Sequence, residues 1–344
     1  MSDLLVTLSL IPAIAKVLVA VLLRLLSAPF RSGSRAPDIY RDVGYTAIRT
    51  LLNSVTAAQE RLSFVNPPTE KIYLEFCEKQ GFQPDTEVIS STGTKLHWLG
   101  PKSAAKTILY FHGGGYARGC SMAHWTWLFE LQNLLRRSGH DVSVAVLGYT
   151  RSTLAPYPTQ LREAAESLNH VLGFKSPRDL VIGGDSAGGN LTMAIISHML
   201  HPHPDTSIPH VFATTDASVV RNKGSDLIGT GVAHRWSAMF LGPHASDPYC
   251  EALKAPPEWF ANLPVLTDRV LLWGGGGELL IDSICDLAKV LKGVIGDKLE
   301  FVEEPMAAHE AFIMDKALGY GTRGEKAEGT AVIEQWVGRQ LSVS

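Results

Sequence analysis

Cysteine is scarce in this chain of 344 residues, and positive charge is not in excess. None of the four cysteines stands in a C-x-x-C pair or another metal-type spacing, which argues against a cysteine-built metal site. We expect free, partly buried thiols at Cys77, Cys120, Cys250 and Cys285. The formal net charge of −3 gives no basic footprint, so we expect no nucleic-acid partner.

Internal repeats and low-complexity linkers are also absent from the sequence, which favours one domain with an insertion over a string of domains. A chain of 344 residues with 45% hydrophobic content can bury one large core. Strand and helix patterns alternate from Thr107 onward, which predicts an α/β fold with a mainly parallel sheet. The expected strands are 107–111, 142–147 and 179–182, and the expected helices are 160–172 and 190–200.

The most informative stretch is 181–190, which places Ser186 in a Gly-x-Ser-x-Gly frame between an apolar strand and a helical pattern. A turn this sharp leaves no room for a Cβ atom at Gly184 and Gly188, and it holds Ser186 in a strained conformation with its hydroxyl exposed. The frame predicts a nucleophile. Taken alone, it also fits an ordinary glycine-rich turn between a strand and a helix.

A second glycine-rich motif, His112-Gly113-Gly114-Gly115-Tyr116, follows the expected strand 107–111. Consecutive glycines leave backbone N–H groups uncovered. We expect the N–H groups of Gly113, Gly114 and Ala187 to form an oxyanion hole that stabilises a tetrahedral intermediate. The order of the two motifs favours this interpretation over a merely flexible turn.

These motifs resemble those of the hormone-sensitive-lipase-like branch of the α/β-hydrolases, a family of serine esterases. The resemblance rests on 112–115, on 184–190 and on the intervening segment 154–161, and it extends from about Thr86 to the C-terminus. It implies the α/β-hydrolase fold, with helices on both faces of a mainly parallel central sheet and a helical cap. The segment 93–100 more narrowly resembles fungal members found among secondary-metabolite biosynthetic enzymes.

A nucleophilic serine needs a base to take its proton and an acid to orient that base, in the chain order Ser, Asp/Glu, His. The run 298–302 reads as the last strand, and the loop after it carries His309 at the place of the family's base. The resemblance therefore assigns this role to His309. We expect most of the other histidines on the surface or in ordinary packing.

The acid is expected after the predicted strand 269–273, where four glycines precede Glu278. The family usually has an aspartate, a leucine two residues on and a second aspartate four residues on, and Glu278, Leu280 and Asp282 fit that frame. The resemblance makes Glu278 the triad acid, in place of the commoner aspartate. Asp282 is the alternative acid; it also fits the first turn of the next helix, where the helix dipole favours a negative charge.

The N-terminal residues 4–26 are almost wholly apolar, interrupted by Lys16 and Arg24, and are about long enough to cross a bilayer. Asp3 precedes this run and Arg31, Arg35 and Arg41 follow it, which argues against a signal peptide and places the catalytic domain on the cytosolic side. Lys16 near the centre weakens a spanning helix. Residues 1–30 are therefore expected to span the membrane, to lie in its interface, or to pack as a cap helix.

We expect cap helices within 31–84 and a cap insertion at about 219–264 of a catalytic domain that covers 85–344. The helical pattern 45–52 carries apolar residues suited to covering a cleft. Large apolar side chains of the insertion predict an apolar substrate pocket; they are Trp236, Met239, Phe240, Trp259 and Phe260.

Together these patterns predict a membrane-associated serine hydrolase that cleaves a carboxylic ester, lactone or thioester of a small apolar molecule through an acyl-enzyme. No cofactor and no metal is implied, and the oligomeric state stays open. The fungal resemblance adds a tailoring step in secondary-metabolite assembly. Two alternatives remain: a cyclase or lyase that uses the same pocket, and a non-catalytic binding protein, against which the candidates for all three triad members argue.

Overall fold

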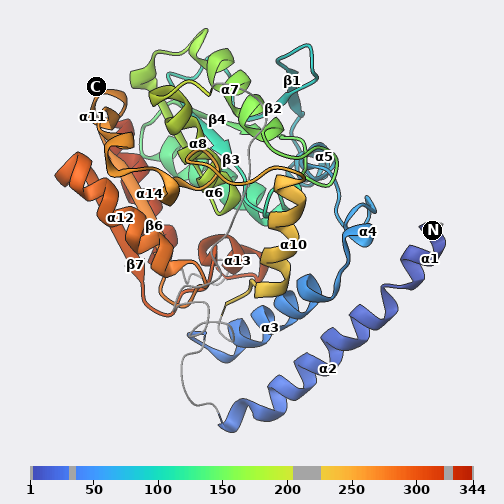
Figure 1. Cartoon of the computed structure of the whole chain (residues 1–344). Helices are drawn as coiled ribbons and strands as arrows, with labels where there is room; N and C mark the ends of the chain where they lie inside the picture. The colour runs from blue at the N-terminus through green and yellow to red at the C-terminus, as the bar shows by residue number, and fades with distance from the viewer. Residues whose placement is uncertain (1–2, 31–35, 204–225, 321–327, 343–344) are drawn as a thin grey trace.

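The computed structural model describes residues 3–30, 36–203, 226–320 and 328–342. At its centre lies a five-stranded sheet in the order β1-β2-β4-β3-β5, accompanied by a two-stranded sheet of β6 and β7 (Figure 1). Strands β3, β4 and β5 are mutually parallel, as are β6 and β7, whereas β2 runs antiparallel to β1 and β4. The strands are β1 (Asp85–Val88), β2 (Lys95–Leu99), β3 (Lys106–Phe111), β4 (Val142–Leu147), β5 (Leu180–Gly184), β6 (Val270–Gly275) and β7 (Leu299–Glu304).

The central strands are buried on both faces because helices cover both. In β3, Ile108 and Tyr110 belong to one core cluster, which also contains residues of α5 and α6. The alternate residues Leu109 and Phe111 belong to a second cluster with residues of α7 and α8. This burial on both faces explains why β3 and β4 consist mostly of apolar residues. The helices are α5 (Thr69–Gln80), α6 (Met122–Arg137), α7 (Thr159–Leu172) and α8 (Ala187–Leu200).

The predicted α/β class and the predicted strands are confirmed, with strand ends displaced by no more than two residues. Helix α8 begins three residues earlier than predicted, at Ala187, because the turn at Ser186 leads directly into it. The C-terminal part adds α11 (Leu263–Leu266), α12 (Ile281–Ile295), α13 (Ala311–Ala317) and α14 (Glu328–Leu341).

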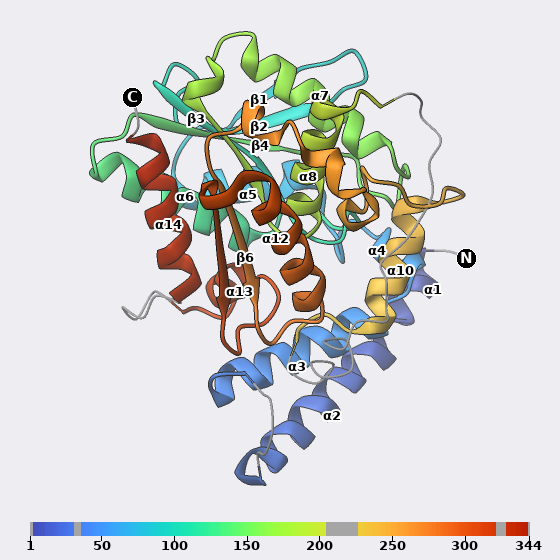
Figure 2. The same cartoon turned by 60° about the vertical axis from the view of Figure 1, so that its left-hand side comes forward.

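The N-terminal helices lie outside this body. Helix α3 lies between the apolar helix α2 and the rest of the molecule, and α10 contacts α3 (Figures 1 and 2). The expected insertion begins at residues 219–225, which lie outside the described residues, as do Arg31 and Arg35. These elements are α1 (Asp3–Leu8), α2 (Ile11–Ser27), α3 (Ile39–Ser54), α4 (Ala57–Glu60) and α10 (Thr230–Leu241).

Helix α10 packs on α3 and α4 through contacts between residues that are 175 to 179 positions apart in the sequence. Glu60 is fully buried and accepts from Trp236 Nε1 at 2.8 Å and from Arg235 Nη2 at 2.9 Å. Asn53 Oδ1 accepts from the N–H of Val232 at 3.1 Å. A buried carboxylate must be paired, so these contacts tie α10 to the N-terminal helices as one layer.

Candidate active site

The strand-turn-helix around Ser186 has the geometry that its glycines predict. Ser186 has φ +50° and ψ −118°, a conformation that side-chain-bearing residues rarely adopt. A Cβ atom on Gly184 would lie 2.3 Å from the carbonyl oxygen of Phe111, and one on Gly188 would lie 1.8 Å from it. Glycine is therefore required at both positions, and the predicted strain at Ser186 is confirmed.

The three residues proposed as a triad come together in the structure. Ser186 Oγ lies 2.7 Å from His309 Nε2, and Glu278 Oε2 accepts a hydrogen bond from His309 Nδ1. Each of the three follows the carboxyl end of a strand, β5, β6 or β7. Both ring nitrogens of His309 are thus engaged. Asp282, the alternative acid, lies in the first turn of α12, as its other interpretation predicted.

The surroundings of His309 stabilise the imidazolium that forms when this side chain takes up a proton. Burial by itself would lower the pKa of His309, but the charge and hydrogen bond of Glu278 outweigh burial and raise it. Glu278 is buried, and its other oxygen, Oε1, accepts from the N–H of Gly275 at 2.6 Å. The carboxylate is therefore fixed at both oxygens and holds the imidazole in one tautomer and orientation.

A further buried carboxylate, Asp226, connects the loops that carry the base and the acid. Its Oδ1 accepts from the N–H of His309 at 2.9 Å, and its Oδ2 accepts from the N–H of Leu279 at 2.8 Å. Burial raises the pKa of Asp226 to about 6. Sequence reasoning missed this residue, because Asp226 belongs to no motif and lies 83 positions from His309.

One position of the predicted oxyanion hole is wrong, because its N–H group is already bonded. The N–H of Gly113 donates to Asp185 Oδ1 at 3.0 Å, so a carboxylate already occupies this donor. Within the described part of the chain, the N–H groups of Gly114 and Gly115 have no hydrogen-bond acceptor. Gly115 lines the same cavity as Ser186 and Ala187. In the described loop, the glycine N–H groups without an acceptor are thus those of Gly114 and Gly115, one residue on from the predicted pair Gly113 and Gly114.

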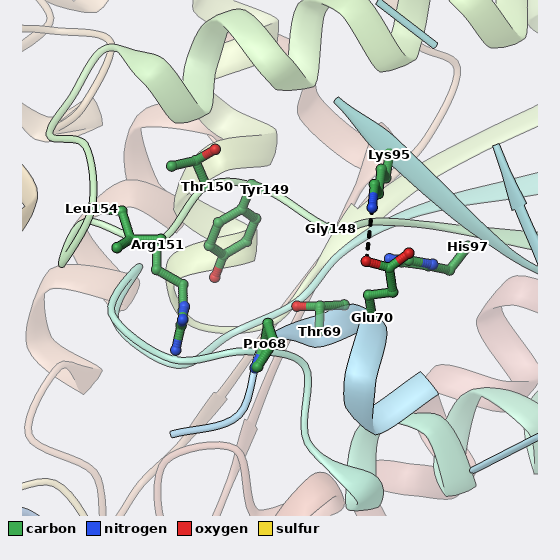
Figure 3. Close-up of a pocket in the computed structure, with 10 residues that line it drawn as sticks. All are labelled: Pro68, Thr69, Glu70, Lys95, His97, Gly148, Tyr149, Thr150, Arg151 and Leu154. Atoms are coloured by element: carbon green, nitrogen blue, oxygen red, sulfur yellow. Dashed lines mark hydrogen bonds and ion pairs between the residues drawn. The ribbon is translucent and has the colours of Figure 1, made fainter. Parts of the chain in front are cut away.

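A neutral histidine supports the glycine loop from behind. His112 is fully buried, and burial lowers its pKa to about 3. Its Nδ1 donates to the carbonyl oxygen of Gly113 at 2.8 Å, and its Nε2 contacts Thr69 Oγ1 at 3.1 Å. Tyr149 stacks on its ring and donates to its carbonyl oxygen at 2.9 Å. Thr69 and Tyr149 also line a small cavity of about 140 Å³ beside the Lys95–Glu70 ion pair (Figure 3).

Behind Ser186 lies a buried polar cluster that sequence reasoning did not identify. Asp185 accepts from Tyr110 Oη at 2.5 Å, from the N–H of Gly113, and from His124 Nε2 at 3.0 Å. Burial would raise the pKa of Asp185, but His124 and these hydrogen bonds lower it. His124, Asp185 and Glu310 come within 4.8 Å of one another. Metal ligands also have such spacing, but here Asp185 already accepts from His124, from Tyr110 and from Gly113, which makes the cluster a hydrogen-bond network.

Helix α10 covers the glycine loop, as the cap hypothesis expects, but only part of the predicted aromatic lining faces the cavity. A Cβ atom on Gly115 would lie 2.1 Å from the ring of Trp236, and Phe240 lines the cavity beside Ser186. Phe260 packs with residues of α12 in a separate core cluster. Trp259 packs against that cluster, and Met239 packs beside Trp236. The segment of Trp259 and Phe260 packs against α8 and α12, and Met239 packs in a cluster with Leu52 of α3.

Comparison with known proteins finds a family model and several esterases. The model described as alpha/beta hydrolase fold matches residues 108–313. An acetyl-hydrolase of Streptomyces hygroscopicus is 29% identical over 117 residues, which are 33% of this chain and 37% of that protein. Ethyl acetate hydrolase of Pseudomonas putida is 30% identical over 131 residues, 35% of this chain and 39% of that protein. Esterase LipI of Mycobacterium tuberculosis is 26% identical over 197 residues, covering 50% and 57%.

The chain thus spans little more than a third of the length of the first two relatives and 57% of the third. Among solved structures, an esterase of the bacterial hormone-sensitive lipase family superposes with a TM-score of 0.62 at 20% identity, covering 89% of this chain and all of that one. A thermostable esterase of Pseudomonas putida superposes with a TM-score of 0.67 at 17% identity, covering 91% and 100%. None of these matches supports the narrower resemblance to fungal secondary-metabolite enzymes.

Proposed function

Since the chain belongs to the α/β-hydrolase fold family, we propose that it is a serine hydrolase that cleaves carboxylic esters through an acyl-enzyme. One observation carries this proposal: Ser186 Oγ lies 2.7 Å from His309 Nε2, while Glu278 binds the opposite ring nitrogen. A serine in hydrogen-bond contact with an oriented base is the arrangement that activates a hydroxyl for attack.

The proposed reaction has two halves. In the first, Ser186 Oγ attacks the ester carbonyl carbon while His309 Nε2 takes the hydroxyl proton. The N–H groups of Gly114, Gly115 and Ala187 bind the oxyanion, and the imidazolium gives its proton to the leaving alcohol. In the second half, His309 takes a proton from a water molecule that attacks the acyl carbonyl. The acid is released and Ser186 regains its proton.

We infer a small apolar ester as substrate. Phe240 and the helix α10 give the cavity an apolar wall beside Ser186. The names of two relatives, acetyl-hydrolase and ethyl acetate hydrolase, support a short acyl group. Lactones and thioesters present the same carbonyl chemistry and belong to the proposed range.

The nucleophile is tested by substitution. We expect Ser186→Ala to abolish hydrolysis of a short-chain aryl ester such as p-nitrophenyl acetate without unfolding the protein, because a methyl group fits the turn. Ser138→Ala, which changes an exposed serine at the end of α6, is the matched control. Activity of Ser186→Ala close to that of the unmodified enzyme would contradict the proposal, and product analysis by mass spectrometry separates hydrolysis from cyclisation or elimination.

A tailoring step in secondary-metabolite assembly is the finer form of the proposal, and it rests on the resemblance of 93–100 alone. Comparison of the metabolites of cells with the intact protein and with Ser186→Ala tests it directly. Accumulation of an esterified metabolite in the variant is the supporting result, and identical metabolite profiles are the contradicting one.

We also propose that α1 and α2 associate the protein with a membrane, with the catalytic domain on the cytosolic side. The apolar stretch Leu5–Ser27 has a mean hydropathy of 2.4 and is only 11% buried. One edge of α2 is fixed to α3, where Arg24 Nη2 and Asp42 Oδ1 form an ion pair of 2.6 Å. A helix docked on the protein along one side and apolar on the other is suited to lying in the membrane interface.

The domain division proposed with this arrangement is an anchor segment of 1–30, cap helices within 31–84, and a catalytic domain of 85–344 with a cap insertion at about 219–264. The contacts of Glu60 with Arg235 and Trp236 support the joint cap of α3, α4 and α10.

A further inference from the structure

The residue directly after the proposed base, Glu310, is buried and has an unusual backbone conformation. Its exposed fraction is 8%, and its φ of +51° lies in the left-handed region that favours glycine. Its Oε1 lies 3.8 Å from His309 Nε2, the nitrogen that contacts Ser186. An acidic side chain is seldom buried in this backbone conformation unless its surroundings hold it there.

The carboxyl groups of Glu310 and Asp185 are both buried, and an oxygen of each lies within 4.8 Å of the other and of a ring nitrogen of His124. Two carboxylates in contact repel each other, so one of them must hold a proton. Asp185 already accepts from Tyr110, from Gly113 and from His124, which are donors that stabilise an anion. The proton between the two acids therefore resides on Glu310, which donates to Asp185.

The two carboxyl groups bring three loops of the site together. Asp185 precedes Ser186 in the nucleophile turn, Glu310 follows His309, and Gly113 opens the glycine loop. A Cβ atom on Gly113 would lie 2.1 Å from Asp185 Oδ2 and 2.3 Å from Glu310 Oε1. Only glycine at position 113 leaves room for both carboxyl groups.

We propose that Glu310 is a positioning residue of the active site, whose protonated carboxyl group binds Asp185 and thereby holds His309 against Ser186. The inference rests on the proposed serine hydrolase function. Loss of the proton would place a second negative charge beside Asp185 and loosen the contact between the two loops. A Glu310 carboxylate would also favour a proton on His309 Nε2, the atom that must accept the hydroxyl proton of Ser186.

The pH at which Glu310 loses its proton is set by the surroundings of Glu310. Burial, together with the negative charge of Asp185, raises the pKa of Glu310 to about 8. Titratable side chains face Glu310 from the nucleophile turn, the base loop, β3, α6 and the loop after β4; they are Asp185, His309, Tyr110, His124 and Tyr149. We therefore expect the rate to decline as the pH rises through about 8.

The experiment compares pH profiles of kcat and kcat/KM on p-nitrophenyl acetate for the unmodified enzyme, Glu310→Gln and Glu310→Ala. A glutamine amide still donates to Asp185 but cannot ionise, so we expect Glu310→Gln to stay within about threefold of the unmodified kcat at pH 7 and to lose the alkaline decline. Glu310→Ala should lower kcat at least tenfold with little change in KM. Glu303→Gln, which changes an exposed carboxylate of β7, is the control and should keep the unmodified profile.

Labelling of Ser186 by a fluorophosphonate provides a readout that needs no substrate. If the unmodified enzyme is labelled and Glu310→Gln keeps the same alkaline decline in labelling rate, the positioning role is wrong while the proposed function stands. Full activity of Glu310→Ala would likewise show that the positioning role is wrong while the proposed function stands. If Ser186 of the unmodified enzyme is neither labelled nor required for turnover, both proposals fail. Should Glu310→Ala not fold, Glu310→Gln alone decides the matter through its profile.

Discussion

Two acids four residues apart, Glu278 and Asp282, have different places in the structure. Glu278 binds His309 Nδ1, whereas Asp282 lies in the first turn of α12. We predict that Glu278→Gln lowers kcat on an aryl ester by on the order of a thousandfold or more, since neutralising a triad acid removes the charge that stabilises the imidazolium. Asp282→Asn should change kcat by less than about threefold. Steady-state kinetics of both variants on one ester checks this, and the reverse ranking would transfer the role to Asp282.

The buried acids Glu310 and Asp226 should make the stability of the protein depend on pH. Burial raises the pKa of Glu310 to about 8 and that of Asp226 to about 6, so the folded state holds protons that the unfolded chain releases near pH 4 to 4.5. The free energy of unfolding should therefore fall as the pH rises from about 4.5 to about 8, by on the order of a few kcal/mol. Denaturant unfolding at pH 5, 6.5 and 8 measures it.

Glu310→Gln should flatten this decline, because its amide does not titrate, while Glu303→Gln should leave it unchanged. An equally steep decline in Glu310→Gln would show that other groups cause it.

At the level of elements, α10 covers the glycine loop and is anchored on α4. We predict that Trp236→Ala lowers the free energy of unfolding by roughly 3 kcal/mol, because it removes a buried ring and the bond from Nε1 to Glu60. Since the ring lies over Gly115, KM for the ester should rise more than kcat falls. The control is His234→Ala, which changes an exposed residue of the same helix. An unchanged KM in a folded Trp236→Ala variant would argue against a cap role for α10.

For the whole molecule, the question is whether the N-terminal segment serves a membrane or the fold. Deletion of residues 1–30 should move the protein from the membrane pellet to the soluble fraction while ester hydrolysis is retained, because Ala13 is the only residue of α2 that is buried. Fractionation followed by an esterase assay measures both properties. A matched variant, Leu18→Asp with Leu22→Asp, changes two side chains that are 66% and 57% exposed and should release the full-length protein as well. A truncated protein that unfolds or loses activity would show that the segment belongs to the cap.

The sequence by itself determined the local chemistry of the site. The Gly-x-Ser-x-Gly turn at Ser186 depends on backbone space within a few residues and on one neighbouring strand, so its strain could be inferred from the glycines at 184 and 188. The alternation of strands and helices likewise has a local period, and the positions of Glu278 and His309 after β6 and β7 follow from it together with the family resemblance.

The tertiary structure decided which backbone N–H groups of the glycine motif remain without a hydrogen-bond acceptor. Whether the N–H of Gly113 can bind an oxyanion depends on Asp185, 72 positions away, and the fixing of His309 depends on Asp226, 83 positions away. The packing of Trp236 over Gly115 likewise depends on two segments that are far apart in the sequence. Burial and hydrogen-bond partners arise only when distant segments pack, and they change the charge and availability of a group without any mark in the local sequence.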